Sequence, residues 1–218
     1  MTLDEIVAAS AAKGLGVVGA FHPGPDDDAG DDVGTLILLG PEGSGLWAAF
    51  SASAEAMDGA PDPMDRWSKR VIDGLAQRTG AKALYPFGGP PWLPFQRWAQ
   101  KAEGAVPSPV GMLASAHRGL WVSYRGALAF KGQIPLSTGD IPDPCAPCPA
   151  PCTTACPVDA FSAGVYDVDR CATHLRSDAG SDCRRGCLVR RACPAGHRLN
   201  LPESQRAFHM AAFLAARP

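Results

Sequence analysis

Two cysteine-rich stretches determine the character of this chain: residues 145–157 read CAPCPAPCTTACP, and residues 171–194 read CATHLRSDAGSDCRRGCLVRRACP. They hold all eight cysteines of the 218-residue chain, four in each stretch, and each stretch ends on a Cys-Pro pair. The first 144 residues contain no cysteine. This contrast predicts two chemically different domains, which we place at residues 1–134 and 135–218.

The spacing of the cysteines favours iron–sulfur ligation over the other uses of dense thiols. The two patterns are Cys145-x2-Cys148-x3-Cys152-x3-Cys156-Pro and Cys171-x11-Cys183-x3-Cys187-x5-Cys193-Pro. Bacterial ferredoxins use C-x2-C-x2-C-x3-C-P, whose fourth cysteine binds the neighbouring cluster. Structural zinc, which prefers paired C-x2-C knuckles, and a disulfide framework remain as alternatives. Zinc is the stronger of these two, because His174 and His197 lie nearby in sequence.

The N-terminal sequence and the net charge limit the compartment and the partners. The stretch MTLDEIVAASAAKG lacks a basic start followed by an apolar run, and no stretch approaches the roughly 18 apolar residues of a membrane helix. We therefore expect a cytoplasmic protein without a membrane partner. Thiols stay reduced in that compartment, which favours metal binding over disulfides. A net charge of −2 argues against a nucleic-acid partner.

The positive charge of the chain gathers with the cysteines. Residues 145–218 contain 9 basic and 6 acidic side chains, whereas residues 1–144 contain 11 and 16. A cluster bound by four thiolates is negatively charged, so nearby cations would lower its electrostatic cost. The candidates are Arg170, Arg184, Arg185, Arg190 and Arg191. A solvated basic face is the alternative interpretation.

The first domain has the pattern of a mixed α/β (α+β) layer. Helical spacing appears at residues 3–11, 63–79 and around 94–101. Apolar runs predict about four strands, at residues 16–21, 34–39 and 81–85 and within 120–130. The acidic stretch GPDDDAGDD, residues 24–32, predicts a solvated loop. In the second domain we expect a short hairpin at Val165, Tyr166 and Val168, and a final helix within residues 202–218.

The stretch CTTACPVDAFSAGVYDVDRC, residues 152–171, resembles the ferredoxin domain of epoxyqueuosine reductases and their relatives. That resemblance implies a bacterial-ferredoxin-like fold with two [4Fe-4S] clusters. It assigns one cluster to Cys145, Cys148, Cys152 and Cys193, and the other to Cys156, Cys171, Cys183 and Cys187. Three spacings are longer than those of the family: 148–152, 183–187 and 187–193. The ligand loops must therefore bulge, and the second group departs further from the pattern.

Three stretches of the first domain are similar to the N-terminal region of the same reductases and of their cobalamin-handling relatives. They are DRWSKRVI (65–72), FGGPPW (87–92) and VGMLASAHRGLWVSYRGALAF (110–130). The resemblance implies a nitroreductase-like reduced α/β layer and, as a cofactor, cobalamin. The candidate cofactor-binding residues are His117, Arg118, Trp121, Tyr124 and Arg125. The alternative is a core strand with Trp121 buried and Arg125 on a solvated face.

Taken together, these patterns predict an iron–sulfur electron-transfer protein or reductase. It would pass low-potential electrons from the two clusters to a cofactor or small-molecule substrate in the first domain. No dinucleotide-binding motif occurs in the sequence, so an external electron donor is expected. Two alternatives stay open. One is a ferredoxin-like or cobalamin-trafficking module without catalysis, and the other is a zinc-stabilised binding protein.

Overall fold

The computed structural model describes residues 2–137, 139–162 and 165–217. The chain divides into two units: residues 1–104 with 123–141 form the first, and residues 105–122 with 142–218 form the second. The main passage between them, at 141/142, lies a few residues beyond the predicted boundary at 134/135. The second unit contains all eight cysteines together with residues 105–122, which precede them in the sequence.

A four-stranded antiparallel sheet forms the centre of the first unit. Its strands are β1 (Gly16–Phe21), β2 (Thr35–Gly40), β6 (Gly126–Phe130) and β3 (Lys82–Leu84), in the order β1-β2-β6-β3. Every residue of β2 and β6 is buried, because helices cover both faces of the sheet. The unit is therefore a mixed helix-and-strand structure with a small antiparallel sheet.

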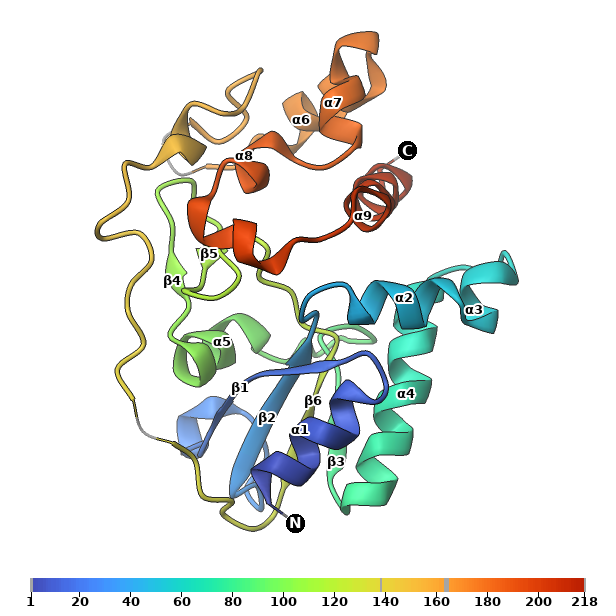
Figure 1. Ribbon diagram of the computed structural model, residues 1–218, viewed down its shortest axis with the longest axis vertical. Coiled ribbons are helices and arrows are strands. Elements are labelled where there is room, and N and C mark those ends of the chain that lie inside the picture. The colour runs from blue at the N-terminus through green and yellow to red at the C-terminus, as the bar shows by residue number, and fades with distance from the viewer. Residues whose placement is uncertain (1, 138, 163–164, 218) are drawn as a thin grey trace. The chain divides into compact units, whose positions relative to one another are not determined.

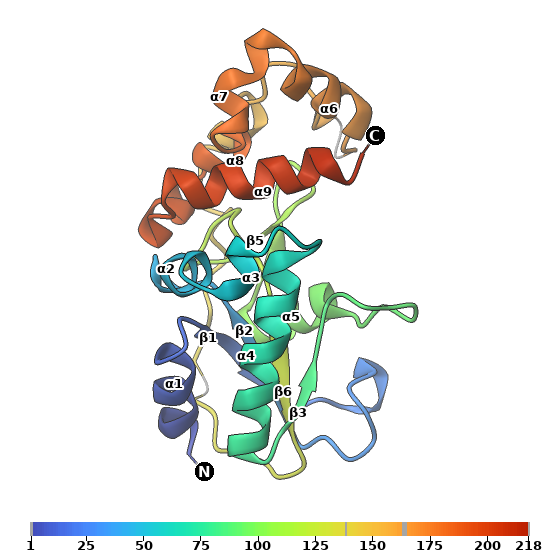
Figure 2. The same ribbon diagram turned by 90° about the vertical axis from the view of Figure 1, so that its right-hand side faces the viewer.

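Helices lie on both sides of this sheet (Figures 1 and 2). Helices α1 (Leu3–Ala11) and α4 (Pro63–Thr79) cover one face, and α5 (Phe95–Glu103) covers the other. Two further helices, α2 (Gly45–Ser51) and α3 (Ala54–Met57), precede α4. The predicted helices at 3–11, 63–79 and 94–101 are confirmed, whereas α2 and α3 were not predicted.

The four strands expected in this unit are also confirmed, with one correction. The apolar run of residues 120–130 forms a strand only from Gly126 onward. Its beginning is a turn, in which the Trp121 N–H donates to the Arg118 carbonyl over 2.9 Å. Arg125 then donates its backbone N–H to the carbonyl of Leu39 over 2.8 Å, which aligns β6 with β2.

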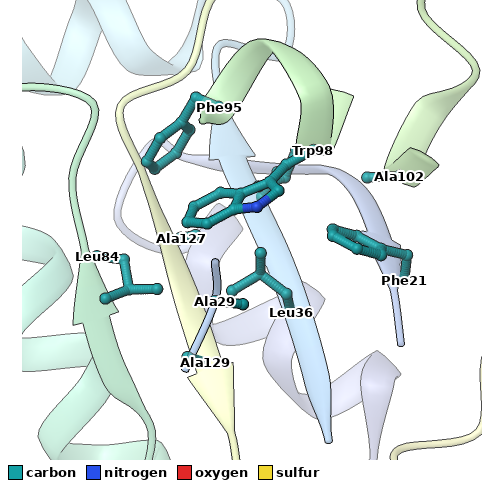
Figure 3. Packing of buried hydrophobic residues seen from close by; sticks show 10 residues of the cluster. Phe21, Ala29, Leu36, Leu84, Phe95, Trp98, Ala102, Ala127 and Ala129 are labelled. Atoms are coloured by element: carbon teal, nitrogen blue, oxygen red, sulfur yellow. The ribbon is translucent and has the colours of Figure 1, made fainter. Parts of the chain in front are cut away.

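The core between α5 and the sheet explains how the acidic loop is held (Figure 3). Phe95 and Trp98 of α5 pack over the sheet, and Trp98 is fully buried. The Trp98 indole N–H donates to the carbonyl of Asp27 over 2.6 Å. Asp27 itself is buried, with the Lys101 ammonium 2.6 Å from its carboxylate. The loop predicted to be solvated is thus anchored to α5 at this residue.

The second unit is built from short elements. A two-stranded sheet joins β4 (Val106–Pro107) to β5 (Leu113–Ala114). The helices are α6 (Val168–Arg176), α7 (Ser181–Arg184), α8 (Leu188–Arg191) and the predicted C-terminal helix α9 (Glu203–Ala215). One- and two-turn 3₁₀ segments lie at Pro151–Thr153, Asp178–Gly180 and Pro194–Leu199.

The hairpin predicted at Val165, Tyr166 and Val168 was wrong. Val168 begins helix α6, because the Asp167 side chain caps it by accepting the backbone N–H of Arg170 over 2.9 Å. Val165 and Tyr166 lie in no regular element, and residues 163–164 of the expected hairpin lie outside the described residues. Among the helices that the structure describes, none has the length and apolarity needed to span a bilayer.

Candidate metal centre

The eight cysteines are all free thiols, and the second unit sorts them into two sets around two cavities. The first cysteine set lines a cavity of about 260 Å³ and consists of Cys145, Cys148, Cys152 and Cys193. The second cysteine set lines a smaller cavity of about 20 Å³ and consists of Cys156, Cys171, Cys183 and Cys187. These are the same two groups of four that the ferredoxin resemblance implied.

Turns rich in proline position the first cysteine set. The Cys148 N–H donates to the Cys145 carbonyl over 3.1 Å, which closes a tight turn between two of the thiols. Asp143 fixes the start of this turn by accepting the Cys145 N–H over 2.7 Å. Prolines at 144, 147, 149 and 151 restrict the backbone between the cysteines. Cys193 joins the set from the other end of the unit, just before Pro194 begins its 3₁₀ segment.

Gly119 packs closely against the loop that carries Cys193. Its φ of +50° is left-handed, and a Cβ there would lie 2.7 Å from Cys193 Sγ and 2.3 Å from the backbone nitrogen of Gly196. Only glycine satisfies both conditions without moving the Cys193 loop. The cavity wall is otherwise mostly apolar, with Ala114 and Leu120 from the same segment, residues 105–122.

Helix ends position the second cysteine set. Cys171 lies in the first half of α6, Cys183 lies in α7, and Cys187 immediately precedes α8. Cys156 Sγ accepts the backbone N–H of Ala160 over 3.3 Å. The remaining lining is mostly apolar and includes Phe161, Leu175, Val189 and Met210.

Backbone geometry absorbs the extra residues in the long cysteine spacings. Between Cys148 and Cys152, Ala150 adopts the left-handed conformation with φ +54°. Between Cys183 and Cys187, Gly186 has φ +136°, a region that side chains rarely enter. The long interval from Cys187 to Cys193 contains the single turn of helix α8. Each predicted bulge therefore has a specific local structure.

Burial and neighbouring thiols raise the pKa of two cysteines in each set. Burial raises the pKa of Cys145, and the Asp143 carboxylate and the other three thiols of its set raise it further. Burial likewise raises the pKa of Cys152, Cys171 and Cys183, and the cysteines that add to the effect belong in each case to the same set. Backbone N–H groups oppose the rise at Cys152 and Cys183. A metal that binds here must displace protons, and it would then relieve the repulsion.

The two histidines near the cysteines have different surroundings. His174 lines the second cavity, and its Nε2 is buried without a hydrogen-bond partner among the described residues. His197 is engaged elsewhere, since its Nε2 lies 3.0 Å from the Arg191 carbonyl oxygen. Over the described residues, no three side chains of His, Cys, Asp and Glu are grouped so that they could hold one metal ion.

The five residues predicted to bind a cofactor are divided between the two units. His117, Arg118 and Trp121 belong to the second unit, whereas Tyr124 and Arg125 belong to the first. Two of them have contacts within their own unit: Trp121 is buried with Leu199 and Leu201, and the Tyr124 hydroxyl donates to Glu103. Their role in binding cobalamin stays a prediction.

Arg125 corrects the alternative interpretation of that segment. Its guanidinium pairs with Asp65, and its Nε donates to Ser68 Oγ over 2.9 Å. Only 12% of the Arg125 side chain is exposed, so it does not lie on a solvated face. Burial of Trp121, which that alternative also expected, is confirmed, at 9% exposure.

Residues 105–122 are the part of the site that the sequence did not predict. Ser108, Ala114 and Leu120 line the first cavity although they precede Cys145 by more than twenty residues. No spacing rule links them to the cysteines, because their contacts depend on the tertiary fold. The one local signal was Gly119, a glycine that lies between Arg118 and Leu120.

Comparison with protein-family models, with curated proteins and with solved structures gave no match to this chain.

Proposed function

We propose that the second unit is a ferredoxin-like iron–sulfur module in which each cysteine set binds one [4Fe-4S] cluster. The observation that carries this proposal is the presence of two separate cavities, each lined by four free thiols. When bound, such clusters accept and donate single electrons at low potential. The chain would supply four thiolates per cluster, backbone N–H groups directed at the sulfurs, and an apolar wall that excludes water.

The size of the first cavity favours a cluster over a single zinc ion. Tetrahedral zinc with Zn–S bonds of about 2.3 Å requires its four sulfurs to lie roughly 3.8 Å apart. In the first cysteine set the four thiols line part of a cavity of about 260 Å³. Over the described residues no three of them are grouped so that they could hold one metal ion, so four thiolates in this arrangement suit a polynuclear group better than a single zinc ion. Gly119, whose missing Cβ leaves room beside Cys193 Sγ, supports the same interpretation.

The second cavity has the same donors but much less room. Its volume of about 20 Å³ is little more than one water molecule needs. Binding a cluster there requires the four thiols to turn outward from the centre. Iron stoichiometry separates the two sites, since about eight irons per chain are expected from both sets and about four from one set.

The first unit, which keeps Tyr124 and Arg125 of the five candidate residues, would hold the electron acceptor. The whole chain would then act as an electron-transfer protein or reductase fed by an external donor. The resemblance suggests a nitroreductase-like layer and cobalamin as the acceptor. A ferredoxin-like or cobalamin-trafficking protein without catalysis is the second candidate, and it requires the same clusters. Adding hydroxocobalamin distinguishes the two candidates. A reductase with reduced clusters lowers the oxidation state of the cobalt, whereas a carrier changes only the spectrum of the bound cobalamin.

The decisive experiment is anaerobic purification followed by iron, acid-labile sulfide and zinc analysis. We expect brown protein with about eight irons and eight sulfides per chain. Cys148→Ser and Cys183→Ser should each remove about half of the iron, because each deletes one ligand from a different set. Thr153→Ser, an exposed substitution beside Cys152, is the matched control and should keep the full content. Colourless protein with stoichiometric zinc would contradict the proposal.

A further inference from the structure

The arginines that accompany the cysteines are not equivalent. Three of the five predicted charge-compensating side chains are paired with carboxylates: Arg170 with Asp167, and Arg185 and Arg191 with Asp182. A fourth, Arg184, donates to the backbone carbonyls of Leu175 and Ser177 over 2.6 and 2.7 Å. Across the described part of the chain, Arg190 forms no ion pair with a carboxylate, and burial lowers the pKa of its guanidinium.

Helix α8, which carries Arg190, lies in the stretch of chain between a cysteine of the second set and a cysteine of the first set. Cys187 precedes this single-turn helix, and Cys193 follows it, donating its N–H to the Arg190 carbonyl over 3.3 Å. The Arg190 guanidinium lies 5.8 Å from the ring centre of the buried Trp121, which limits where the charge can move. Cys187 of the second cysteine set is the N-cap of this same four-residue helix, and it opposes the lowering of the Arg190 pKa by burial.

A second group beside the second cysteine set is the His174 ring, which can donate a hydrogen bond. The ring lines the second cavity, and its buried Nε2 has no partner in the described ranges. A buried polar nitrogen without a partner costs about 1–3 kcal/mol, so its persistence requires an explanation. Hydrogen bonds to cluster sulfurs and nearby positive charge both raise a cluster's reduction potential, because they stabilise the electron that is added.

The first cysteine set has the opposite surroundings. The Asp143 carboxylate accepts the Cys145 N–H over 2.7 Å and lies beside that thiol. The rest of the lining is mostly proline and alanine, which supply no charge. A carboxylate beside a negatively charged cluster disfavours reduction.

We propose that the two sites are electronically unequal, with Arg190 and His174 making the second cysteine set the higher-potential site. In half-reduced protein the added electron then resides on the second set, and the first set holds the stronger reductant. This inference rests on the proposed function, since it assumes that both sets bind clusters. Arg190 and His174 are positioning residues that act on the cluster without ligating it.

A redox titration of the full-length protein, monitored by EPR, tests which cysteine set has the higher reduction potential. Wild type should show two potentials, and Cys148→Ser and Cys183→Ser assign them by removing one each. Arg190→Gln should lower the higher potential by about 59 mV, which is a tenfold change in a one-electron equilibrium. Arg185→Gln removes an equal charge from an exposed residue paired with Asp182, and it should leave both potentials near wild type. Equal shifts in these two variants, or assignment of the higher potential to the first set, would overturn the inference.

Two further variants keep the test decisive if Arg190→Gln fails to load clusters. Arg190→Lys retains the charge and should keep the wild-type potential, whereas His174→Phe removes the donor and should lower only the higher potential. A fall with lysine, or no fall with phenylalanine, would contradict the inference. Wild-type protein that carries no iron would instead refute the proposed function itself, so the two failures are distinguishable.

Discussion

At the scale of single residues, the candidate site depends on a few residues that set the position of the cysteine thiols and the space beside them. Gly119 leaves room beside Cys193 Sγ, Ala150 accepts a left-handed backbone, and Asp143 fixes the first turn. None of these side chains is a ligand. Each directs a thiol or keeps space beside one, which is the usual work of groups around a metal site.

Gly119→Ala should empty the first cysteine set. The added Cβ would collide with Gly196 and Cys193 and also pays about 1 kcal/mol for the left-handed backbone. We expect iron to fall by about half while the second set stays loaded. Gly43→Ala is the control, because Gly43 has φ +59° with nothing within 4 Å of the added atom. Full iron in Gly119→Ala would show that the Cys193 loop can move, and iron loss in both variants would point to backbone strain alone.

Glu55 gives the first unit a defined acid sensitivity. A hydrogen bond from Arg70 holds the pKa of Glu55 at about 2, below its ordinary 4.5. Because the native state favours the ionised form, this contribution is complete above about pH 4.5 and is lost as the pH falls toward 2. The urea midpoint of the full chain should therefore fall less between about pH 4.5 and pH 2 in Glu55→Gln than in the wild type. Glu42→Gln, at an exposed carboxylate, is the control, and an unchanged pH profile for Glu55→Gln would refute the assignment.

At the scale of elements, strong local patterns were predictable and tertiary ones were not. Helix α4 was predicted with its observed ends, because Pro63 opens it and Gly80 closes it in the left-handed conformation. Strand β6 was predicted too long, because a turn at 118–121 interrupts its apolar run. The hairpin near Val165 was wrong because the Asp167 cap starts a helix instead. Residues 105–122 belong to the unit that contains the cysteines through tertiary contacts, which the spacing of residues in the sequence does not predict.

The fit of α5 against the sheet predicts a large stability loss for Trp98→Ala. This side chain is fully buried and its indole N–H holds the Asp27 carbonyl. Removing it should cost about 3–5 kcal/mol, from the cavity and the lost transfer energy. Trp92→Ala is the same substitution at a side chain that is 65% exposed, and it should change stability by less than about 0.5 kcal/mol. Urea unfolding of both variants checks this, and similar losses would contradict the packing argument.

At the scale of the whole molecule, the two units are stabilised by different means. The first buries complete strands and large side chains such as Trp67, Trp98 and Phe50. The second has helices α7 and α8 of only four residues each, and a small core that includes Cys152. Helices this short are not stable alone, so under the proposed function the second unit would draw stability from the groups bound by its cysteines.

Removal of metal should therefore unfold the second unit while the first stays folded. In hydrogen exchange on the full chain treated anaerobically with a chelator, segments 168–176 and 181–191 should lose protection. Strands β2 and β6, buried on both faces, should keep theirs. The same experiment on Cys148→Ser should show whether losing one set is enough. Uniform loss of protection across both units would mean that the chain unfolds as one cooperative body, and unchanged protection would mean that the apolar core of the second unit suffices without metal. The predicted outcome follows from the sizes of the two cores, because a metal site contributes folding energy only to the unit whose thiols it ties together.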